Sequence, residues 1–211
     1  MNVLIVQTGY KDMAKSKEQF KEIRDQRYEE FSNAALNIFA RKGFAATKIS
    51  DITSSVNLSY GLFYHYFKSK EHLYVSLISN ILDLFIETVT EVENREDTPK
   101  EKLEWLTELT FSGSLEHALN RHILVIEALQ SDFLPNEIKE EFIQKFTTAI
   151  GGLCRIIEQG QKDGLFIEGD PMELAIYYQS LTQGLTLWNA RGLYPIVVEI
   201  SVEKVMRFFL A

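Results

Sequence analysis

The chain has 211 residues, of which 45% are hydrophobic and 25% are charged. This length and composition allow a substantial core in one or two domains, and they exclude an intrinsically disordered chain. Charged residues interrupt every apolar run before it reaches the roughly 20 residues that a membrane span needs. We therefore expect a cytoplasmic protein that does not associate with a membrane.

The amino terminus and the cysteine content are also those expected of a cytoplasmic protein. The apolar run at residues 3–6 follows no basic residue and precedes no small-residue cleavage site, so it is not a signal peptide. Residues 1–14 are interpreted as a disordered or strand-like leader, with Met13 as an alternative start. The one cysteine, Cys154, cannot form an intramolecular disulfide, and we interpret it as core filler rather than a nucleophile.

Charge is distributed unevenly along the chain. The net charge is −8, yet residues 1–72 carry eleven lysines and arginines against eight acidic residues, a net charge of +3, which leaves −11 for the remainder. A basic end attracts polyanions such as nucleic acid, whereas an acidic body repels them. The distribution therefore indicates two parts with different partners, with random charge scatter as the alternative.

The helical periodicity of the chain predicts an all-α fold. All four prolines lie beyond residue 95, each at a position where a helix can begin. No alternating pattern typical of strands competes with this interpretation. We expect about nine helices, near residues 17–42, 48–55, 59–66, 70–94, 99–115, 117–130, 135–162, 171–190 and 195–210, in two domains, residues 1–72 and 73–211.

The first three predicted helices have the pattern of a helix-turn-helix braced by a longer helix. Phe31, Ala35 and Phe39 share one face of the first helix, which ends at the sequence RKGF. Thr47 is placed to cap the second helix and Ser59 the third. Asn57, in the turn between them, suits the left-handed backbone conformation that tight turns often need.

The third helix is unusually aromatic. Residues 60–67 contain five aromatic rings and a histidine. A short helix buries only one stripe of its surface, so some of these rings must face outward. By spacing alone, Leu62 or Phe63 and then Tyr66 or Phe67 can pack inward, and the remaining rings face outward.

The stretch AALNIFARKGFAATKISDITSSVNLSYGLFYHYFKSKEHLYVSLI resembles the DNA-binding domain of TetR-family transcriptional regulators over about 45 residues. The F-x-x-x-G-F-x-x-T-K-I entry, the D-I turn and the Y-x-Y-F-x-S-K exit occur in order at the spacing of that family. Two positions depart from its pattern. Asn57 stands where glycine is frequent, which does not affect the fold, and Tyr60 stands where a small or basic residue is usual, which affects the operator sequence.

The resemblance implies a homodimeric repressor that binds a palindromic operator in double-stranded DNA and is released by a small-molecule effector. The residues expected at the DNA are Thr47, Lys48, Ser59, Tyr60, Gly61, Leu62, Tyr64, His65, Lys68 and Lys70. Backbone amides at the start of the fourth helix, capped by Ser69, would converge with the two flanking lysines on one phosphate. The alternative is that these tyrosines and lysines are ordinary surface residues.

The same resemblance implies a pocket for an effector and a dimer interface of two terminal helices. The residues expected at the pocket, each of which is alternatively a core residue, are Trp105, Phe111, His117, His122, Phe142, Phe146 and Tyr178. The residues expected at the dimer interface are Leu174, Tyr177, Leu181, Leu185, Trp188, Val198, Val202, Val205 and Phe209. The alternative is that both apolar stripes face the core of their own subunit.

The chain shows no catalytic motif. It has no G-x-S-x-G, no phosphate-binding loop and no dinucleotide fingerprint, and the GG pair at 151–152 is interpreted as close helix packing. His117 and His122 are five residues apart, which does not match the spacing of two metal ligands on one helix face. We expect no enzyme activity, no metal and no cofactor. The alternatives are a helical enzyme and a small-molecule-binding protein without a DNA function.

Overall fold

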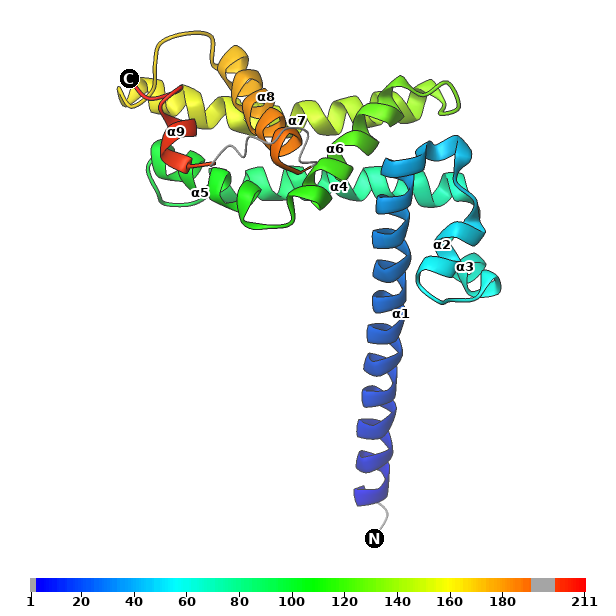
Figure 1. Cartoon of the computed structure of the whole chain (residues 1–211). Helices are drawn as coiled ribbons and strands as arrows, with labels where there is room; N and C mark the ends of the chain where they lie inside the picture. The colour runs from blue at the N-terminus through cyan, green and yellow to red at the C-terminus, as the bar shows by residue number, and fades with distance from the viewer. Residues whose placement is uncertain (1–2, 191–199) are drawn as a thin grey trace. The chain divides into compact units, whose positions relative to one another are not determined.

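The computed structural model describes the backbone of residues 3–190 and 200–211, and the side chains of residues 19–190 and 200–211. These residues form nine helices and no β-strand, which confirms the all-α prediction (Figure 1). The chain divides into two compact units, Met1–Tyr74 and Val75–Ala211.

The helices follow one another with short connections. The first unit contains α1 (Val3–Ala46), α2 (Ile49–Ser55), α3 (Tyr60–Tyr66) and the beginning of α4 (Lys70–Glu93). The second unit contains the rest of α4, α5 (Pro99–Ser112), α6 (Leu115–Gln130), α7 (Asn136–Lys162), α8 (Pro171–Ala190) and α9 (Val202–Met206). Pro99 and Pro171 are the first residues of their helices, as predicted, because a helix tolerates proline best at that position.

Helix α1 is longer than the sequence indicated. It begins at Val3, so the prediction of a disordered or strand-like leader at residues 1–14 is wrong. No proline precedes residue 99, and Gly9 alone lowers helix propensity by only about 1 kcal/mol, so no residue in this segment forces the helix to start later. Helical geometry is interrupted at Gly43 (φ 76°, ψ 160°), where the RKGF sequence predicted the end of the helix.

The first unit is built around aromatic rings. Phe31, Phe39, Phe63 and Phe67 are almost fully buried. The ring of Phe31 meets that of Phe63 edge-on at 5.8 Å and that of Phe67 at 6.2 Å, a geometry that aromatic pairs favour. These contacts fix α3 against α1, so the opposite face of α3 is turned to solvent.

The second unit has a core formed mainly by α5, α7 and α8. Helix α7 packs against α8, and α5 packs against α7 and α9. A Cβ atom at Gly152 would lie only 2.5 Å from Val89 Cγ1, so glycine is required where α7 approaches α4. This confirms close helix packing at Gly152, whereas a Cβ atom at Gly151 would meet nothing closer than Arg155 Nη1 at 3.6 Å.

The carboxyl terminus differs from the predicted helix at 195–210. Helix α9 ends at Met206, and Phe166 and Leu210 then form an isolated antiparallel bridge. The Ile167 N–H donates to the Phe209 carbonyl at 3.0 Å, and the Ala211 N–H donates to the Leu165 carbonyl at 3.1 Å. These long-range hydrogen bonds replace a continuing helix, and they draw the apolar tail into the core of its own subunit.

Helix α4 is long and apolar enough to cross a membrane by length and composition alone. A core helix of a folded domain passes the same test. The buried residues of α4 are Leu73, Tyr74, Leu77, Ile78, Leu82, Val89 and Val92. In the first unit, Tyr74 packs edge-on against Phe39 at 5.1 Å, and Val89 belongs to the core of the second unit. The apolar face of α4 is therefore used within both units.

Candidate functional site

Helices α2 and α3 are joined by a tight turn. Asn57 adopts a left-handed conformation with φ 54°, as predicted. The Leu58 N–H donates to the Thr53 carbonyl at 3.0 Å and ties the turn back to α2. Ser59 caps α3, since its Oγ atom accepts a hydrogen bond from the Leu62 N–H at 3.1 Å. The turn and the cap together fix the orientation of α3.

The outward face of α3 presents a pair of tyrosines. Tyr60 is 54% exposed and Tyr64 is 47% exposed. Their ring centroids are 5.2 Å apart and their hydroxyl oxygens are 3.2 Å apart, because the two residues lie one helical turn apart. The hydrogen bond with Tyr60 is the main cause of the raised pKa of Tyr64. This face therefore offers two aromatic rings with linked hydroxyl groups.

Other residues of this face are also accessible. His65 and Lys68 are exposed, and Leu62 is half-buried. A Cβ atom at Gly61 would meet no heavy atom within 4 Å, so packing inside the subunit does not require glycine there. The first turn of α3 consequently has no side-chain bulk between its two flanking residues, Tyr60 and Leu62.

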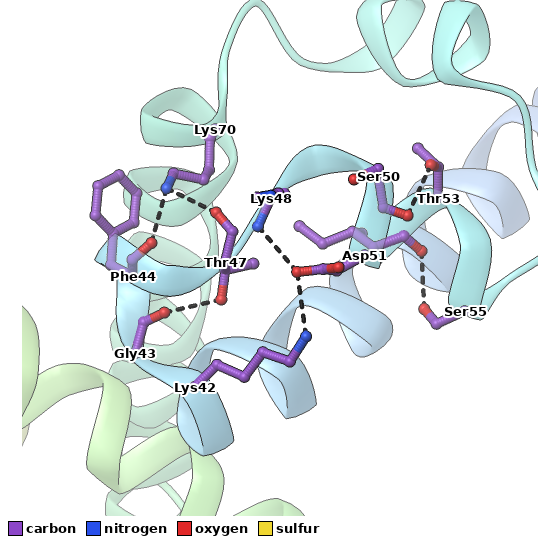
Figure 2. Close-up of polar contacts among 11 residues, drawn as sticks. Lys42, Gly43, Phe44, Thr47, Lys48, Ser50, Asp51, Thr53, Ser55 and Lys70 are labelled. Carbon is purple, nitrogen blue, oxygen red and sulfur yellow. Dashed lines mark hydrogen bonds and ion pairs between the residues drawn. The ribbon is translucent and has the colours of Figure 1, made fainter.

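Lys70 does not extend toward a partner, in contrast to its prediction as a phosphate contact. Its Nζ atom donates to the carbonyl oxygens of Phe44 at 2.7 Å and Thr47 at 2.8 Å, and it lies 4.2 Å from the centre of the Phe44 ring (Figure 2). Carbonyl oxygens near the end of a helix carry partial negative charge, which attracts the cation. Lys70 therefore ties the start of α4 to the connection between α1 and α2.

Thr47 does not cap α2, so the prediction for this residue is also wrong. The residue is 2% exposed, and its Oγ1 atom donates to the Gly43 carbonyl at 2.8 Å (Figure 2). The N-cap position of α2 belongs to Lys48, which is exposed. A buried hydroxyl group whose proton is already shared with a carbonyl oxygen is not free to bind a phosphate group.

Asp51 stabilises the beginning of α2. Its carboxylate accepts a hydrogen bond from the Lys48 N–H at 3.1 Å and forms an ion pair with Lys42 at 3.2 Å (Figure 2). The hydrogen bond from Lys48, followed by that from Lys42, holds the pKa of Asp51 below its ordinary value. The N–H of Lys48 is thus satisfied internally, while its side chain remains exposed.

Ser69 caps α4, as predicted. Its Oγ atom accepts a hydrogen bond from the His72 N–H at 3.1 Å. His72 in turn accepts a hydrogen bond through Nδ1 from the Lys68 N–H at 3.3 Å. The exposed Lys68 side chain is therefore attached to a well-fixed backbone at the start of a long helix.

The second unit contains a cavity of about 480 Å³. Its wall is formed by α4, α5, α6, α7 and α8. The lining residues are Ile81, Leu82, Leu84, Phe85, Thr88, Leu106, Leu109, Thr110, Gly113, Ser114, His117, Ala118, Leu119, Arg121, His122, Val125, Phe146, Tyr178, Gln179, Thr182, Gln183 and Thr186. This size falls within the range typical of small-molecule sites.

Part of the predicted pocket lines this cavity. His117, His122, Phe146 and Tyr178 do so. The other three predicted residues do not. Phe142 is buried in the protein, Trp105 packs against the core with the Arg95 guanidinium 4.9 Å from its ring centre, and Phe111 lies outside the lining. Aromatic residues occur both in the core and at the cavity wall, so residue type alone did not distinguish the two kinds of position.

The sequence prediction missed most of the lining, including its one arginine. Arg121 lies one helical turn after His117 on α6, so both side chains face the same way. An arginine close to the apolar run at residues 123–126 was an available signal. The polar lining residues of α8 were not predicted, because the many apolar residues of the same helix suggested an interface or a core instead.

Tyr178 is held rigidly at the cavity wall. Its hydroxyl oxygen lies 2.8 Å from Thr107 Oγ1, and Thr107 Oγ1 donates to the Leu103 carbonyl at 2.7 Å. Burial raises the pKa of Tyr178 well above its ordinary value, so the phenol stays neutral. The wall at this point is therefore mostly aromatic ring, with its hydroxyl group already satisfied.

The predicted dimer stripe on α8 combines two faces of the helix. Leu174 is buried, and Leu181 packs against the core of its own subunit. Tyr177 and Trp188 are exposed, whereas Leu185 is half-buried. The prediction of an interface therefore fails for Leu174, because its side chain is used inside the subunit.

The second predicted stripe fails more completely. Val205 and Phe209 are buried in the core of the second unit, and Val202 packs against the same core. Val198 lies outside the described residues. The side chains of Val205 and Phe209 are already covered by their own subunit and do not form a surface for a partner.

Instead, α8 carries an exposed face in a different register. The exposed residues with large apolar side chains on this face are Ile176, Tyr177, Leu187 and Trp188, and the exposed small residues between them are Ser180 and Gly184. A Cβ atom at Gly184 would meet no heavy atom within 4 Å. Packing within the subunit therefore does not account for the glycine.

Comparison with known proteins identifies the first unit. Residues 32–77 match the family model described as "Bacterial regulatory proteins, tetR family". The match extends from the middle of α1 into α4 and so contains the whole helix-turn-helix.

Relatives match over most of the chain. The HTH-type transcriptional repressor KstR2 of Mycolicibacterium smegmatis is 27% identical over 195 residues, which cover 88% of this chain and 87% of that protein. The fatty acid metabolism regulator protein of Bacillus subtilis is 26% identical over 167 residues, which cover 77% of this chain and 83% of that protein. The solved structure of the ketosteroid transcriptional regulator KstR2 of Mycobacterium tuberculosis shares the fold, with a TM-score of 0.69 at 19% identity, over 88% of this chain and 95% of that one.

The helix-turn-helix and these relatives define the class: the chain is a DNA-binding transcriptional regulator and not an enzyme. Its helix-turn-helix unit matches the TetR family over residues 32–77.

Proposed function

We propose that the protein is a cytoplasmic repressor that binds a palindromic operator as a homodimer and releases it when a small molecule occupies the cavity of the second unit. The observation that carries the proposal is the outward tyrosine pair on α3, fixed over an aromatic core by a capped turn. Relatives that match most of the chain are named as transcriptional repressors or regulators.

The DNA surface consists of α3 and the helix starts around it. Tyr60, in the first turn of α3, lies in the part of a recognition helix that reaches base edges in helix-turn-helix proteins. Tyr64 and His65 follow along the same helix. The exposed Lys48 and Lys68 supply charge for the phosphate backbone. Gly61 and Leu62 adjoin the groove, and the backbone at Ser59 presents the start of α3.

Thr47 and Lys70 have an indirect role in this proposal. Lys70 holds the connection between α1 and α2 against the start of α4 through two hydrogen bonds. Thr47 closes the same connection onto Gly43. Both residues therefore fix the starts of α2 and α4 without contacting DNA.

Dimerisation uses the exposed face of α8. Apolar residues at both ends of this face flank Ser180 and Gly184, whose small size would let a partner helix approach closely. Glycine within a helix costs about 1 kcal/mol in helix propensity, and a contact between subunits accounts for its presence. In a dimer of this kind the two recognition helices bind half-sites about one DNA turn apart, roughly 34 Å.

DNA is released because the effector binds two conformations of the protein with different affinities. An effector that binds the cavity more tightly in a conformation with mis-spaced recognition helices shifts the population toward that conformation, and DNA is released. The largely apolar lining suits an effector with a hydrocarbon body. One of the relatives is named as a regulator of fatty acid metabolism, which is in keeping with such an effector.

The test is selection of genomic DNA fragments by the purified protein, followed by a mobility-shift assay on the recovered sequence. We expect a palindromic site that is bound at nanomolar protein concentration. The matched control is the double variant Tyr60→Ala and Tyr64→Ala, which removes both outward rings and leaves the core residues Phe63 and Phe67 in place. Failure to select any fragment at low salt would favour a small-molecule-binding protein without a DNA function.

A further inference from the structure

Arg121 is a half-buried cation with no partner among the described residues. It lies on α6, is half-buried, and lines the cavity. Among the described residues, its guanidinium group forms no ion pair and no hydrogen bond. A guanidinium group has five N–H donors in a planar fork, which suits it to an anionic acceptor. The group is therefore prepared for an acceptor that the described protein does not supply.

No carboxylate compensates the charge of Arg121. The residues that line the cavity include no aspartate and no glutamate. Burial is the one cause that lowers the pKa of Arg121, and no acidic group lies close enough to oppose it. Arginine nevertheless stays charged at neutral pH. The cavity consequently holds one positive charge without a counter-charge.

The neighbouring polar residues do not neutralise this charge. Burial lowers the pKa of His122 below its ordinary value, so its imidazole is neutral near pH 7. On the facing helix, Gln179 and Gln183 contribute amide groups to the lining. Amide N–H groups can add hydrogen bonds to an anion that the guanidinium group already holds.

Much of the remaining cavity lining is apolar. Leu82 and Phe85 come from α4, Leu106 comes from α5, and Phe146 comes from α7. These side chains offer hydrocarbon and aromatic surface to the interior. The cavity thus joins an apolar region to a single site for an anion, and a ligand complementary to it must be amphipathic.

We infer that the effector is an amphipathic anion, with a carboxylate or phosphate group held by Arg121 and a hydrocarbon body against α4 and α5. The inference rests on the proposed function only in treating the occupant of the cavity as the effector. A cavity of about 480 Å³ has room for about 16 groups the size of a water molecule. A medium-chain carboxylic acid meets both the size and the charge.

The test measures binding directly, without DNA, by calorimetry with decanoate at pH 7.5. Decan-1-ol and decylamine have the same hydrocarbon chain with a neutral and a cationic end. We expect decanoate to bind at least about 10-fold more tightly than decan-1-ol, because a hydrogen-bonded charge pair is stronger than a neutral hydrogen bond. Decyl phosphate is measured beside decanoate, and the tighter of the two identifies the anionic group.

Arg121→Gln tests the role of the guanidinium group. In this variant, decanoate should bind no more tightly than decan-1-ol, whereas the affinity for decan-1-ol should stay within about 2-fold. The melting temperature should not fall, because the variant removes a half-buried charge that has no partner among the described residues. Arg155→Gln is the matched control, since Arg155 lies on α7 outside the cavity and pairs with Glu93. It should retain the full preference for decanoate.

The outcomes separate this inference from the proposed function. Equal affinity for decanoate and decan-1-ol in the unmodified protein, or an unchanged preference in Arg121→Gln, would overturn the anion site. Failure of all four probes to bind at millimolar concentration would overturn it as well. Decanoate that binds through Arg121 but leaves the operator complex intact would uphold the anion site and count against effector release.

Discussion

The ammonium nitrogen of Lys70 lies 2.8 Å from the carbonyl oxygen of Thr47, although 22 residues separate them in the chain. The same nitrogen donates to Phe44 and lies over its ring. Lys70 therefore fixes the connection that leads into α2 against the helix that follows α3. Lys70 thereby links the segments that precede α2 and follow α3.

Lys70→Met should destabilise the protein rather than remove a phosphate contact. The variant loses two hydrogen bonds from a charged donor, and we expect a loss of about 2 kcal/mol in the free energy of unfolding. DNA affinity should fall modestly, while the slope of log K against log salt stays unchanged. Urea denaturation and binding titrations at several salt concentrations measure the two quantities.

Lys68→Met is the comparison for Lys70→Met. Lys68 is exposed, so its substitution should leave stability within about 0.5 kcal/mol. If Lys68 binds one phosphate group per subunit, the salt slope should decrease by about 2 per dimer. A salt slope that falls for Lys70→Met and not for Lys68→Met would reverse the two roles.

The local features of the helix-turn-helix were predictable from the sequence, because they depend on neighbouring residues. The cap at Ser59 and the left-handed Asn57 follow from turn chemistry. Periodicity narrowed the inward residues of this segment to Leu62 or Phe63 and Tyr66 or Phe67, and the structure buries Phe63 and Phe67. The role of Lys70 was not predictable in this way. Its acceptors lie more than 20 residues earlier, and a lysine in sequence gives no indication of whether its charge meets a carbonyl group or a partner.

The second unit was harder to predict for the same reason. Helix α8 has apolar residues on its buried and exposed faces alike, so a stripe through Leu174 and one through Ile176 are equally regular in sequence. Which face is buried depends on where α6 and α7 pack. The end of α9 is likewise decided by hydrogen bonds between Ala211 and Leu165, which no local pattern specifies.

Tyr60→Lys should change the specificity of the regulator. A tyrosine in the first turn of α3 offers a ring edge for a thymine methyl group and a hydroxyl, whereas a lysine favours guanine acceptors or phosphate. We expect higher non-specific affinity and a loss of discrimination of roughly 10-fold to 100-fold at one base pair of each half-site. This loss of discrimination is measured by binding to a panel of operators, each altered at one position, at matched salt.

The position that loses discrimination in Tyr60→Lys should be an A·T pair, because only this pair presents a thymine methyl group. Tyr64→Phe serves as control, since it keeps the ring and removes the hydroxyl that meets Tyr60. It should weaken binding to all operators alike. A uniform change across the panel for Tyr60→Lys would assign Tyr60 to the DNA backbone instead.

Ile176→Glu should yield a folded monomer. Ile176 is 50% exposed in the subunit, so a charge there is tolerated by the monomer but is buried without a partner in a dimer through α8. We expect unchanged helical content and the sedimentation behaviour of a single chain at micromolar concentration. Analytical ultracentrifugation and circular dichroism measure these properties.

Leu181→Glu is the contrasting variant on the same helix. Leu181 packs against the core of its own subunit, so the glutamate should destabilise the fold itself and lower the melting temperature. If Ile176→Glu remained dimeric and Leu181→Glu were a folded monomer, the interface would lie on the face of α8 that carries Leu181 and not on the face that carries Ile176.

The buried pair of Thr107 and Tyr178 joins α5 to α8. Thr107 Oγ1 donates to the Leu103 carbonyl and therefore accepts from the Tyr178 hydroxyl. Tyr178→Phe removes one hydrogen bond and should cost about 1 kcal/mol in the free energy of unfolding. Thr107→Val should cost more, about 1–3 kcal/mol, because it leaves the Tyr178 hydroxyl buried with only the Leu103 carbonyl, at 3.4 Å.

The double variant distinguishes a coupled pair from two independent residues. With both hydroxyl groups removed, no buried donor is left without an acceptor, so the double variant should be no less stable than Thr107→Val alone. Urea denaturation of the four proteins gives the coupling energy. Additive losses would mean that the two hydroxyl groups do not depend on each other, and that the contact between α5 and α8 at the cavity wall rests on apolar packing alone.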